Sequence, residues 1–136
     1  MINKLNVVTI LVRDQEEALR FYTEKLGFEK RADQMFGPGV RWLTVAPPDQ
    51  EEVEIVLQKP DPTMHGEEQA EALLALVGKT PTWSFSTDDC RAAHKTLSAR
   101  GVNFVQPPEE RPYGVEALFE DLYGNVFSLL EQREEA

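Results

Sequence analysis

Residues 12–28 read VRDQEEALRFYTEKLGF and carry the clearest element boundaries in the chain. Asp14 is suited to cap the amino end of a helix, and Glu17, three residues later, is its capping-box partner. The apolar residues that follow recur at helical spacing: Ala18, Leu19, Tyr22 and Leu26. Gly27 is a natural helix stop. The stretch therefore predicts a helix between the end of one strand and the start of another.

Strand-like segments lie on both sides of this helix. Leu5–Val12 is an apolar, β-branched run typical of a buried strand. Three further segments follow the helix: Phe28–Phe36, Val40–Ala46 and Val53–Leu57. Turn-forming residues 47–49, Pro-Pro-Asp, separate the last two. The first half therefore predicts the order β-α-β-β-β.

The second half repeats that order. Thr82–Thr87 predicts a strand, and Asp88 or Asp89 caps a helix that Gly101 ends. Ala93 and Leu97 are expected to face inward from this helix. Three strands are expected after it: Val102–Val105, Val115–Phe119 and Val126–Leu130. The chain thus contains the same pattern twice.

The two halves also agree in register, at an offset of about 75 residues. The expected pairs of equivalent positions are Val7 with Thr82, Asp14 with Asp89, Arg41 with Glu116, and Glu54 with Ser128. This predicts an α+β fold built from two tandem βαβββ units. Within one domain of 136 residues, the first unit spans 1–59, a connector 60–80, the second unit 81–132 and a tail 133–136. The connector is expected to hold an amphipathic helix over Glu67–Val77, with Leu73, Leu74 and Val77 on one side.

Two motifs resemble those of the vicinal oxygen chelate superfamily, which includes glyoxalase, extradiol dioxygenases and bleomycin-resistance proteins. The first is formed by Val12, Asp14, Phe21, Tyr22, Leu26, Gly27 and Phe28. The second is residues 119–125, FEDLYGN, which is similar to the family's Phe-x-Asp-Pro-Asp-Gly-Asn turn, with Leu122 and Tyr123 in place of Pro-Asp. The resemblance implies that each unit curls into a partial barrel, so that the two tandem βαβββ units form a curved mixed sheet around a cleft.

In metal-dependent members of that superfamily, four positions facing the cleft bind a divalent cation, typically through His and Glu. The resemblance places them at Val7, Glu54, Thr82 and Ser128. Only Glu54 is a plausible ligand, and such sites need roughly three protein ligands. No metal and no cofactor are therefore expected there. His65, or His94 together with Cys90, could bind metal elsewhere, although positions on amphipathic helices explain these residues more simply.

Nine residues are candidates for ligand binding: the resemblance places four of them at the cleft, others share a strand face with these because side chains two apart point the same way, and the rest lie on neighbouring strands. They are Val7, Thr9, Arg41, Trp42, Glu54, Thr82, Ser84, Glu116 and Ser128. Glu54 could bind a cationic group or act as a base, or it could be a solvated carboxylate at the cleft mouth. Arg41 and Glu116 could clamp a polar ligand or be structural. Trp42 could form an aromatic wall, or lie in the core or a dimer interface.

Composition excludes several classes of protein. The net charge of −10, from 24 acidic and 14 basic residues, opposes binding to nucleic acid or to an anionic membrane. Cys90 is the single cysteine, which rules out an intrachain disulfide. No segment reaches membrane-spanning length. A cytoplasmic location is the expectation.

The favoured function is metal-independent binding of an unidentified small organic molecule in the cleft, as in bleomycin-resistance proteins. The alternative is a lyase, isomerase or dioxygenase-like enzyme that uses Glu54 as base or an unrecognised divalent metal site. A third hypothesis is an interaction module whose duplication is only structural. The resemblance also implies a homodimer.

Overall fold

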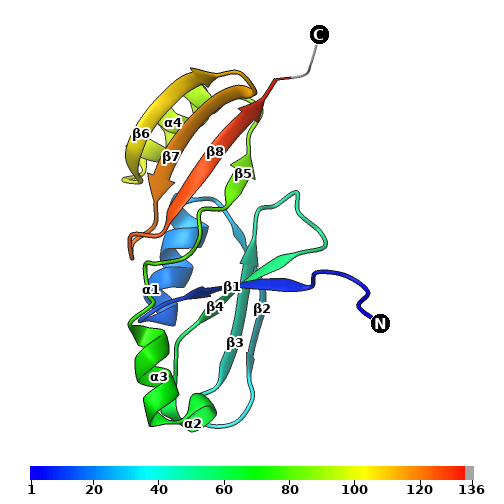
Figure 1. The fold of residues 1–136 in the computed structure, drawn as a ribbon, viewed down its shortest axis with the longest axis vertical. Coiled ribbons are helices and arrows are strands. Elements are labelled where there is room, and N and C mark those ends of the chain that lie inside the picture. The colour runs from blue at the N-terminus through cyan, green and yellow to red at the C-terminus, as the bar shows by residue number, and fades with distance from the viewer. Residues whose placement is uncertain (134–136) are drawn as a thin grey trace. The chain divides into compact units, whose positions relative to one another are not determined.

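The structure is a computed structural model that describes residues 1–133. Of the predicted tail, only Arg133 falls within this range. Residue contacts divide the chain into two compact units, Met1–Gly78 and Lys79–Ala136. Each unit contains one four-stranded mixed sheet with helices (Figure 1). The predicted α+β fold of two tandem βαβββ units is confirmed.

The first unit begins with a βαβββ arrangement. Its elements are β1 (Val7–Leu11), α1 (Gln15–Arg20), η1 (Phe21–Lys25), β2 (Glu29–Met35), β3 (Arg41–Ala46) and β4 (Glu54–Gln58). The strands lie in the order β1-β4-β3-β2, with β1 parallel to β4 and the other pairs antiparallel. Helix α1 packs on β4. On one face of the sheet, the side chains of Ile10, Leu43, Val45 and Leu57 are fully buried.

The predicted helix starts where expected but changes its winding. Asp14 Oδ1 accepts the N–H of Glu17 at 3.0 Å, which confirms the amino-terminal cap. From Phe21 onward the turn is π-helical, and the N–H of Leu26 donates to the carbonyl of Phe21 at 3.2 Å. The wider turn lets two consecutive aromatic residues, Phe21 and Tyr22, both lie in the core.

Two short helices complete the first unit, α2 (Pro62–His65) and α3 (Glu67–Leu74). The single connector helix predicted over 67–77 is thus wrong at its end, because α3 stops at Leu74. Ala70 and Val77 are buried, whereas Leu74 is exposed. The apolar side of the connector therefore differs from the predicted one at this position.

The second unit follows the same order. Its elements are β5 (Ser84–Ser86), α4 (Cys90–Ala99), β6 (Asn103–Arg111), β7 (Gly114–Glu120) and β8 (Val126–Gln132). The strand order is β5-β8-β7-β6, with β5 parallel to β8. Helix α4 packs on β6, β7 and β8 (Figure 1). Asp89, rather than Asp88, caps α4 by accepting the N–H of Ala92 at 3.0 Å.

Two strands of the second unit differ from prediction. β5 is shorter than 82–87, so Thr82 lies outside the strand and is exposed. Pairing with β8 begins only at Ser84, and Pro81 cannot donate to a ladder before it. β6 is longer than 102–105 and runs through Pro107 and Pro108 at an irregular register. An edge strand tolerates these prolines because one side of it is unpaired.

The described residues include no helix long and apolar enough to cross a membrane.

Candidate functional site

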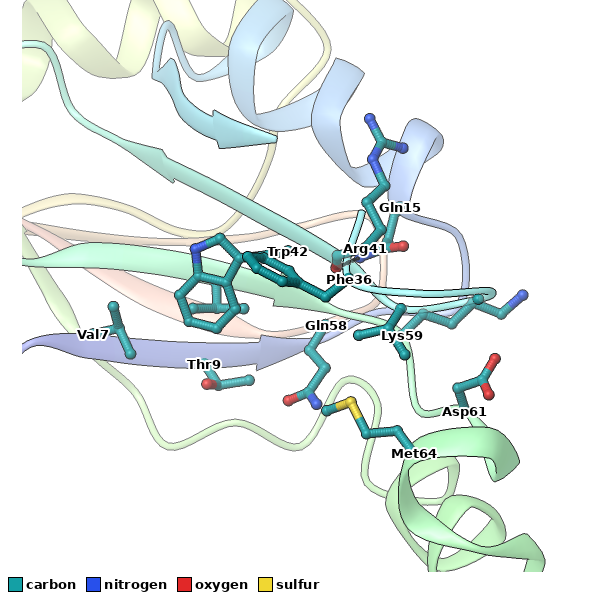
Figure 2. A pocket seen from close by; sticks show the side chains of 13 residues that line it. Val7, Thr9, Gln15, Phe36, Arg41, Trp42, Gln58, Lys59, Asp61 and Met64 are labelled. Atoms are coloured by element: carbon teal, nitrogen blue, oxygen red, sulfur yellow. Dashed lines mark hydrogen bonds between the residues drawn. The ribbon is translucent and has the colours of Figure 1, made fainter. Parts of the chain in front are cut away.

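The first unit contains a hollow of about 210 Å³ on the open face of its sheet (Figure 2). Strands β1, β3 and β4 form its floor. The β2–β3 turn, Gln15 at the start of α1, and α2 form its walls. The lining residues are Val7, Thr9, Gln15, Phe36, Gly39, Val40, Arg41, Trp42, Val56, Gln58, Lys59, Asp61 and Met64.

Strand periodicity explains which residues reach the floor. Thr9 pairs with Val56 across the parallel β1–β4 ladder, and Thr44 pairs with Val56 across β3–β4. Residues two positions away share the same face, which brings Val7, Trp42 and Gln58 to this side. Four predicted site residues of the first unit line one hollow: Val7, Thr9 and Trp42 on its floor and Arg41 at its edge.

Large apolar side chains lie open around the hollow. Phe36 is 60% exposed, Trp42 38% and Met64 51%. They come from three places: the β2–β3 turn, strand β3 and helix α2. Figure 2 shows the Trp42 and Phe36 rings above the strands and Met64 directed from α2 toward Gln58. Such a group of exposed apolar side chains on a concave surface is typical of a site that an organic molecule covers.

The Arg41 side chain is held by two carboxylates. Its Nε and Nη2 donate to Asp33 Oδ1 and Oδ2 at 2.8 and 2.9 Å, and its Nη1 lies 2.6 Å from Glu16 Oε1. The Arg41 guanidinium lowers the pKa of Asp33 from its ordinary value of 3.8 to about 2, mainly through these hydrogen bonds. The hydrogen bond with Asp33 in turn raises the pKa of Arg41. Arg41 thus joins α1, β2 and β3 at the edge of the hollow.

Glu54 lies on the same sheet face but is not a lining residue. It is half-buried, pairs with Val7, and its Oε1 accepts the hydroxyl of Thr44 at 2.6 Å. Val56, two residues further along β4, lines the hollow instead of Glu54. A direct role of Glu54 in the hollow therefore has no support from this geometry.

Gln58 connects the floor of the hollow to α2. Its Nε2 lies 3.3 Å from His65 Nε2, and the backbone N–H of Asp61 points to His65 Nδ1 at 3.5 Å. Gln58, Phe36 and Met64 were not among the residues predicted from the sequence. Gln58 continues the period-2 pattern of Glu54 and Val56, so the strand alternation could have indicated it.

Three predicted residues of the second unit form a hydrogen-bonded chain. Ser84 Oγ lies 3.5 Å from Ser128 Oγ, and the Ser128 hydroxyl donates to Glu116 Oε2 at 2.7 Å. Tyr113 donates to Glu116 Oε1 at 2.8 Å. These hydrogen bonds, that of Ser128 first, lower the pKa of Glu116. Thr82 is exposed and does not take part in this series of hydrogen bonds.

The backbone hydrogen bonds correct the predicted equivalence of Glu54 and Ser128. The N–H of Val12 donates to Gln58 O, and the N–H of Thr87 donates to Leu130 O. Val12 and Thr87 each lie two residues before the aspartate that caps the helix of their unit, so these two donors are equivalent. Their acceptors, Gln58 and Leu130, are therefore equivalent as well. Counting back two residues, Val56 corresponds to Ser128. Sequence alone misaligned these strands, because the loops before β4 and β8 differ in length.

The side chains at the four positions that the family resemblance implies for a metal do not fit a divalent-metal centre. With the corrected register they are those of Val7, Val56, Thr82 and Ser128, which offer no imidazole and no carboxylate. Residues 1–133 contain no group of three or more His, Cys, Asp or Glu side chains that could hold a metal ion. His94 packs edge-on against Phe104 at 4.5 Å between ring centroids.

Comparisons with known proteins agree with this fold. The family sequence model of the Glyoxalase/Bleomycin resistance protein/Dioxygenase superfamily matches residues 4–129 of this chain. The crystal structure of UcmS2 is 45% identical, covers 97% of this chain and 100% of UcmS2, and gives a TM-score of 0.86.

Two further relatives cover nearly the whole chain. TnmS3, an antibiotic binding protein from Streptomyces sp. CB03234, is 34% identical, with 97% of this chain and 98% of TnmS3 covered and a TM-score of 0.78. The protein YetH of Bacillus subtilis (strain 168) is 34% identical over 131 residues, which are 96% of this chain and 100% of YetH.

Proposed function

The chain belongs to the glyoxalase/bleomycin resistance protein/dioxygenase superfamily, and on that basis we propose that it binds a small, largely apolar organic molecule in the hollow of its first unit, without a divalent metal ion. The family resemblance predicted from the two sequence motifs is confirmed by the match. The proposed ligand contains a flat ring, and binding rather than chemical conversion is the proposed role.

One observation carries this proposal: Phe36, Trp42 and Met64 expose large apolar surfaces around a single hollow. Aromatic side chains gain most from flat ring partners, which they contact by offset stacking or edge to face. Met64 adds an unbranched, polarisable side chain that can adapt to different ligand outlines. Water is a poor occupant of such a surface, so an apolar ring that displaces it is stabilised.

The relatives support a ligand-binding role. TnmS3 is an antibiotic binding protein, and it shares 34% of its residues with this chain over almost the full length of both. An antibiotic-like organic molecule is therefore the proposed ligand class. The absence of His and Glu side chains from the four family metal positions supports binding without a metal ion.

Titration of ¹⁵N-labelled protein with indane, a flat two-ring hydrocarbon, tests the proposal. The chain has two tryptophans, and each indole N–H gives its own NMR signal. We expect the Trp42 signal to shift as indane fills the hollow. The Trp83 signal is the internal control, because its ring packs against Phe127 at 6.1 Å in the second unit. Trp42→Phe identifies the signals, and a Trp42 signal that does not respond would contradict the proposal.

An enzyme is the second candidate function, as a lyase, isomerase or dioxygenase-like protein. The observation that favours it is the position of Glu54 on the same sheet face as the hollow, two residues before Val56. A ligand longer than the hollow would approach this carboxylate, which could then act as a general base. Recovery of a chemically altered ligand after incubation would favour the enzyme over the binding protein.

The proposal includes a homodimer, which the family resemblance implies, and a cytoplasmic location, which the composition predicts. Light scattering on the purified protein tests the dimer: it predicts a mass of twice the 15.4 kDa of one chain. A mass of one chain at micromolar concentration would contradict it.

A further inference from the structure

The tautomer of His65 follows from a donor that cannot rotate. The backbone N–H of Asp61 points to His65 Nδ1 at 3.5 Å, and peptide geometry fixes the direction of that N–H. In the neutral ring one nitrogen carries the proton and the other accepts. Nδ1 must accept, because a proton on it would face the Asp61 N–H. The ring proton of His65 therefore lies on Nε2.

This tautomer determines the orientation of the Gln58 amide. His65 Nε2–H lies 3.3 Å from the end of the Gln58 side chain, so that end must be an acceptor. The two ends of a carboxamide have the same shape, and the oxygen fits beside His65 as well as the nitrogen does. In Figure 2 the terminal atoms of Gln58 point apart, one toward Met64 and the other toward the side of Thr9. With the oxygen beside His65, the NH₂ group takes the second position.

Gln58 and Thr9 both line the hollow, and with the oxygen beside His65 the Gln58 NH₂ group takes the terminal position on the side of Thr9. It thereby offers a donor at a surface that is otherwise largely apolar. We infer that Gln58, oriented by His65, donates a hydrogen bond to a carbonyl oxygen of the ligand, which is accordingly a flat ring compound that bears a carbonyl group. Gln58 is the residue that contacts the ligand, and His65 is a positioning residue. The inference rests on the proposed function, since it concerns the ligand of the same hollow.

The Gln58 NH₂ group should select ligands that carry a hydrogen-bond acceptor, such as a carbonyl oxygen, over ligands whose polar groups are all donors. An ammonium group brought to the Gln58 NH₂ group would place two donors together, which leaves both without a partner. Rotation of the amide would relieve that conflict only by breaking the contact with His65 Nε2–H. Selection of acceptor-bearing ligands therefore depends on the His65 tautomer.

The tautomer can be measured without any ligand. A long-range ¹H–¹⁵N correlation spectrum, recorded at about pH 8 where free imidazoles are neutral, separates the two tautomers of a histidine ring. We expect the Nε2–H pattern for His65, assigned by comparison with His65→Ala. The Nδ1–H pattern would overturn the inference and would leave the proposed function intact.

Affinity for a matched pair of probes tests the carbonyl. 1-Indanone and indane have the same two-ring frame and differ by one carbonyl group, and both are titrated against the Trp42 indole signal. One neutral hydrogen bond predicts that the native protein binds 1-indanone about 3- to 10-fold more tightly. Equal affinities would overturn the inference alone. Failure of both probes to bind would overturn the proposed function and the inference with it.

Two variants assign the preference to its residues. Gln58→Glu keeps an acceptor toward His65 but removes the NH₂ group, so the preference for 1-indanone should disappear. Gln69→Glu, on the exposed side of α3, makes the same change of charge away from the hollow and should leave the preference unaltered. His65→Ala should reduce the preference by about half while indane affinity is maintained, because the amide is then free to rotate. A preference that survives in Gln58→Glu would overturn the inference.

Discussion

Val56 and Ser128 hold equivalent positions in the two units. Each pairs, across a parallel strand ladder, with a residue five positions before the aspartate that caps the helix of its unit. Val56 pairs with Thr9, and Ser128 pairs with Ser84. One side chain of this equivalent pair is a hydrocarbon and the other is a neutral hydroxyl. Neither can anchor a catalytic divalent ion, and the nearest carboxylate on β4, that of Glu54, lies two residues from the equivalent position.

Purified protein should therefore retain far less than one divalent ion per chain. The measurement is elemental analysis of protein prepared without added metal, and again after incubation with nickel, zinc, manganese or iron followed by gel filtration. A donor set of two valines, a threonine and a serine predicts no stable binding. One tightly held ion per chain would contradict the assignment of the four positions and favour an enzyme.

Replacement of Glu54 by Gln should change indane and 1-indanone affinity by less than about 2-fold, because Glu54 does not line the hollow. Glutamine keeps an acceptor for the Thr44 hydroxyl, so the local fold should be preserved. A loss of binding in Glu54→Gln with an unchanged melting temperature would place the carboxylate against the ligand. That outcome would revive its role as a base or as a partner for cationic groups.

Local signals in the sequence predicted much of the fold. The caps at Asp14 and Asp89 depend on a side chain and a backbone N–H three residues apart, and such short-range chemistry is visible in a sequence. The π-helical turn at Phe21 could not be predicted, since it arises when two adjacent aromatic residues both enter the core. The register of β4 was wrong because it depends on loop lengths, and a two-residue slip preserves the alternation of faces.

The candidate site was predicted only where strands form it. Val7, Thr9 and Trp42 follow from alternation along β1 and β3, and the structure brings them together. Phe36 and Met64 come from a turn and a short helix, whose position depends on tertiary packing rather than on any period. The walls of a binding site are commonly built from such segments, so sequence periodicity finds the floor before the walls.

Asp33 should make stability depend on pH below about 4. Its pKa falls from 3.8 to about 2 in the folded protein because of the Arg41 hydrogen bonds. A carboxyl group with a lowered pKa contributes stability above its unfolded value, and the contribution is lost as pH falls from about 4 to about 2. The Asp33→Asn variant should be less stable at pH 7 by about 0.5–1 kcal/mol, a magnitude typical of a partly exposed bidentate pair.

Urea unfolding at pH 7 and at about pH 2.5 measures this contribution. The difference in unfolding free energy between the native protein and Asp33→Asn should become smaller at the lower pH, because the native carboxylate is then partly protonated. Asp49→Asn, in the turn between β3 and β4, is the matched control and should show no such difference. A difference that is the same at both pH values would mean that the Arg41–Asp33 contact stabilises the fold without its charge.

Met64 and Met35 allow the apolar wall to be tested with a paired control. Both side chains are exposed, at 51% and 61%, but only Met64 lines the hollow. Met64→Ala removes a flexible apolar wall and should weaken indane binding by about 3- to 10-fold, whereas Met35→Ala should leave it unchanged. Since both methionines are exposed in the free protein, neither change should lower the melting temperature by more than about 2 °C. Equal loss of affinity in the two variants would show that indane binds outside the hollow.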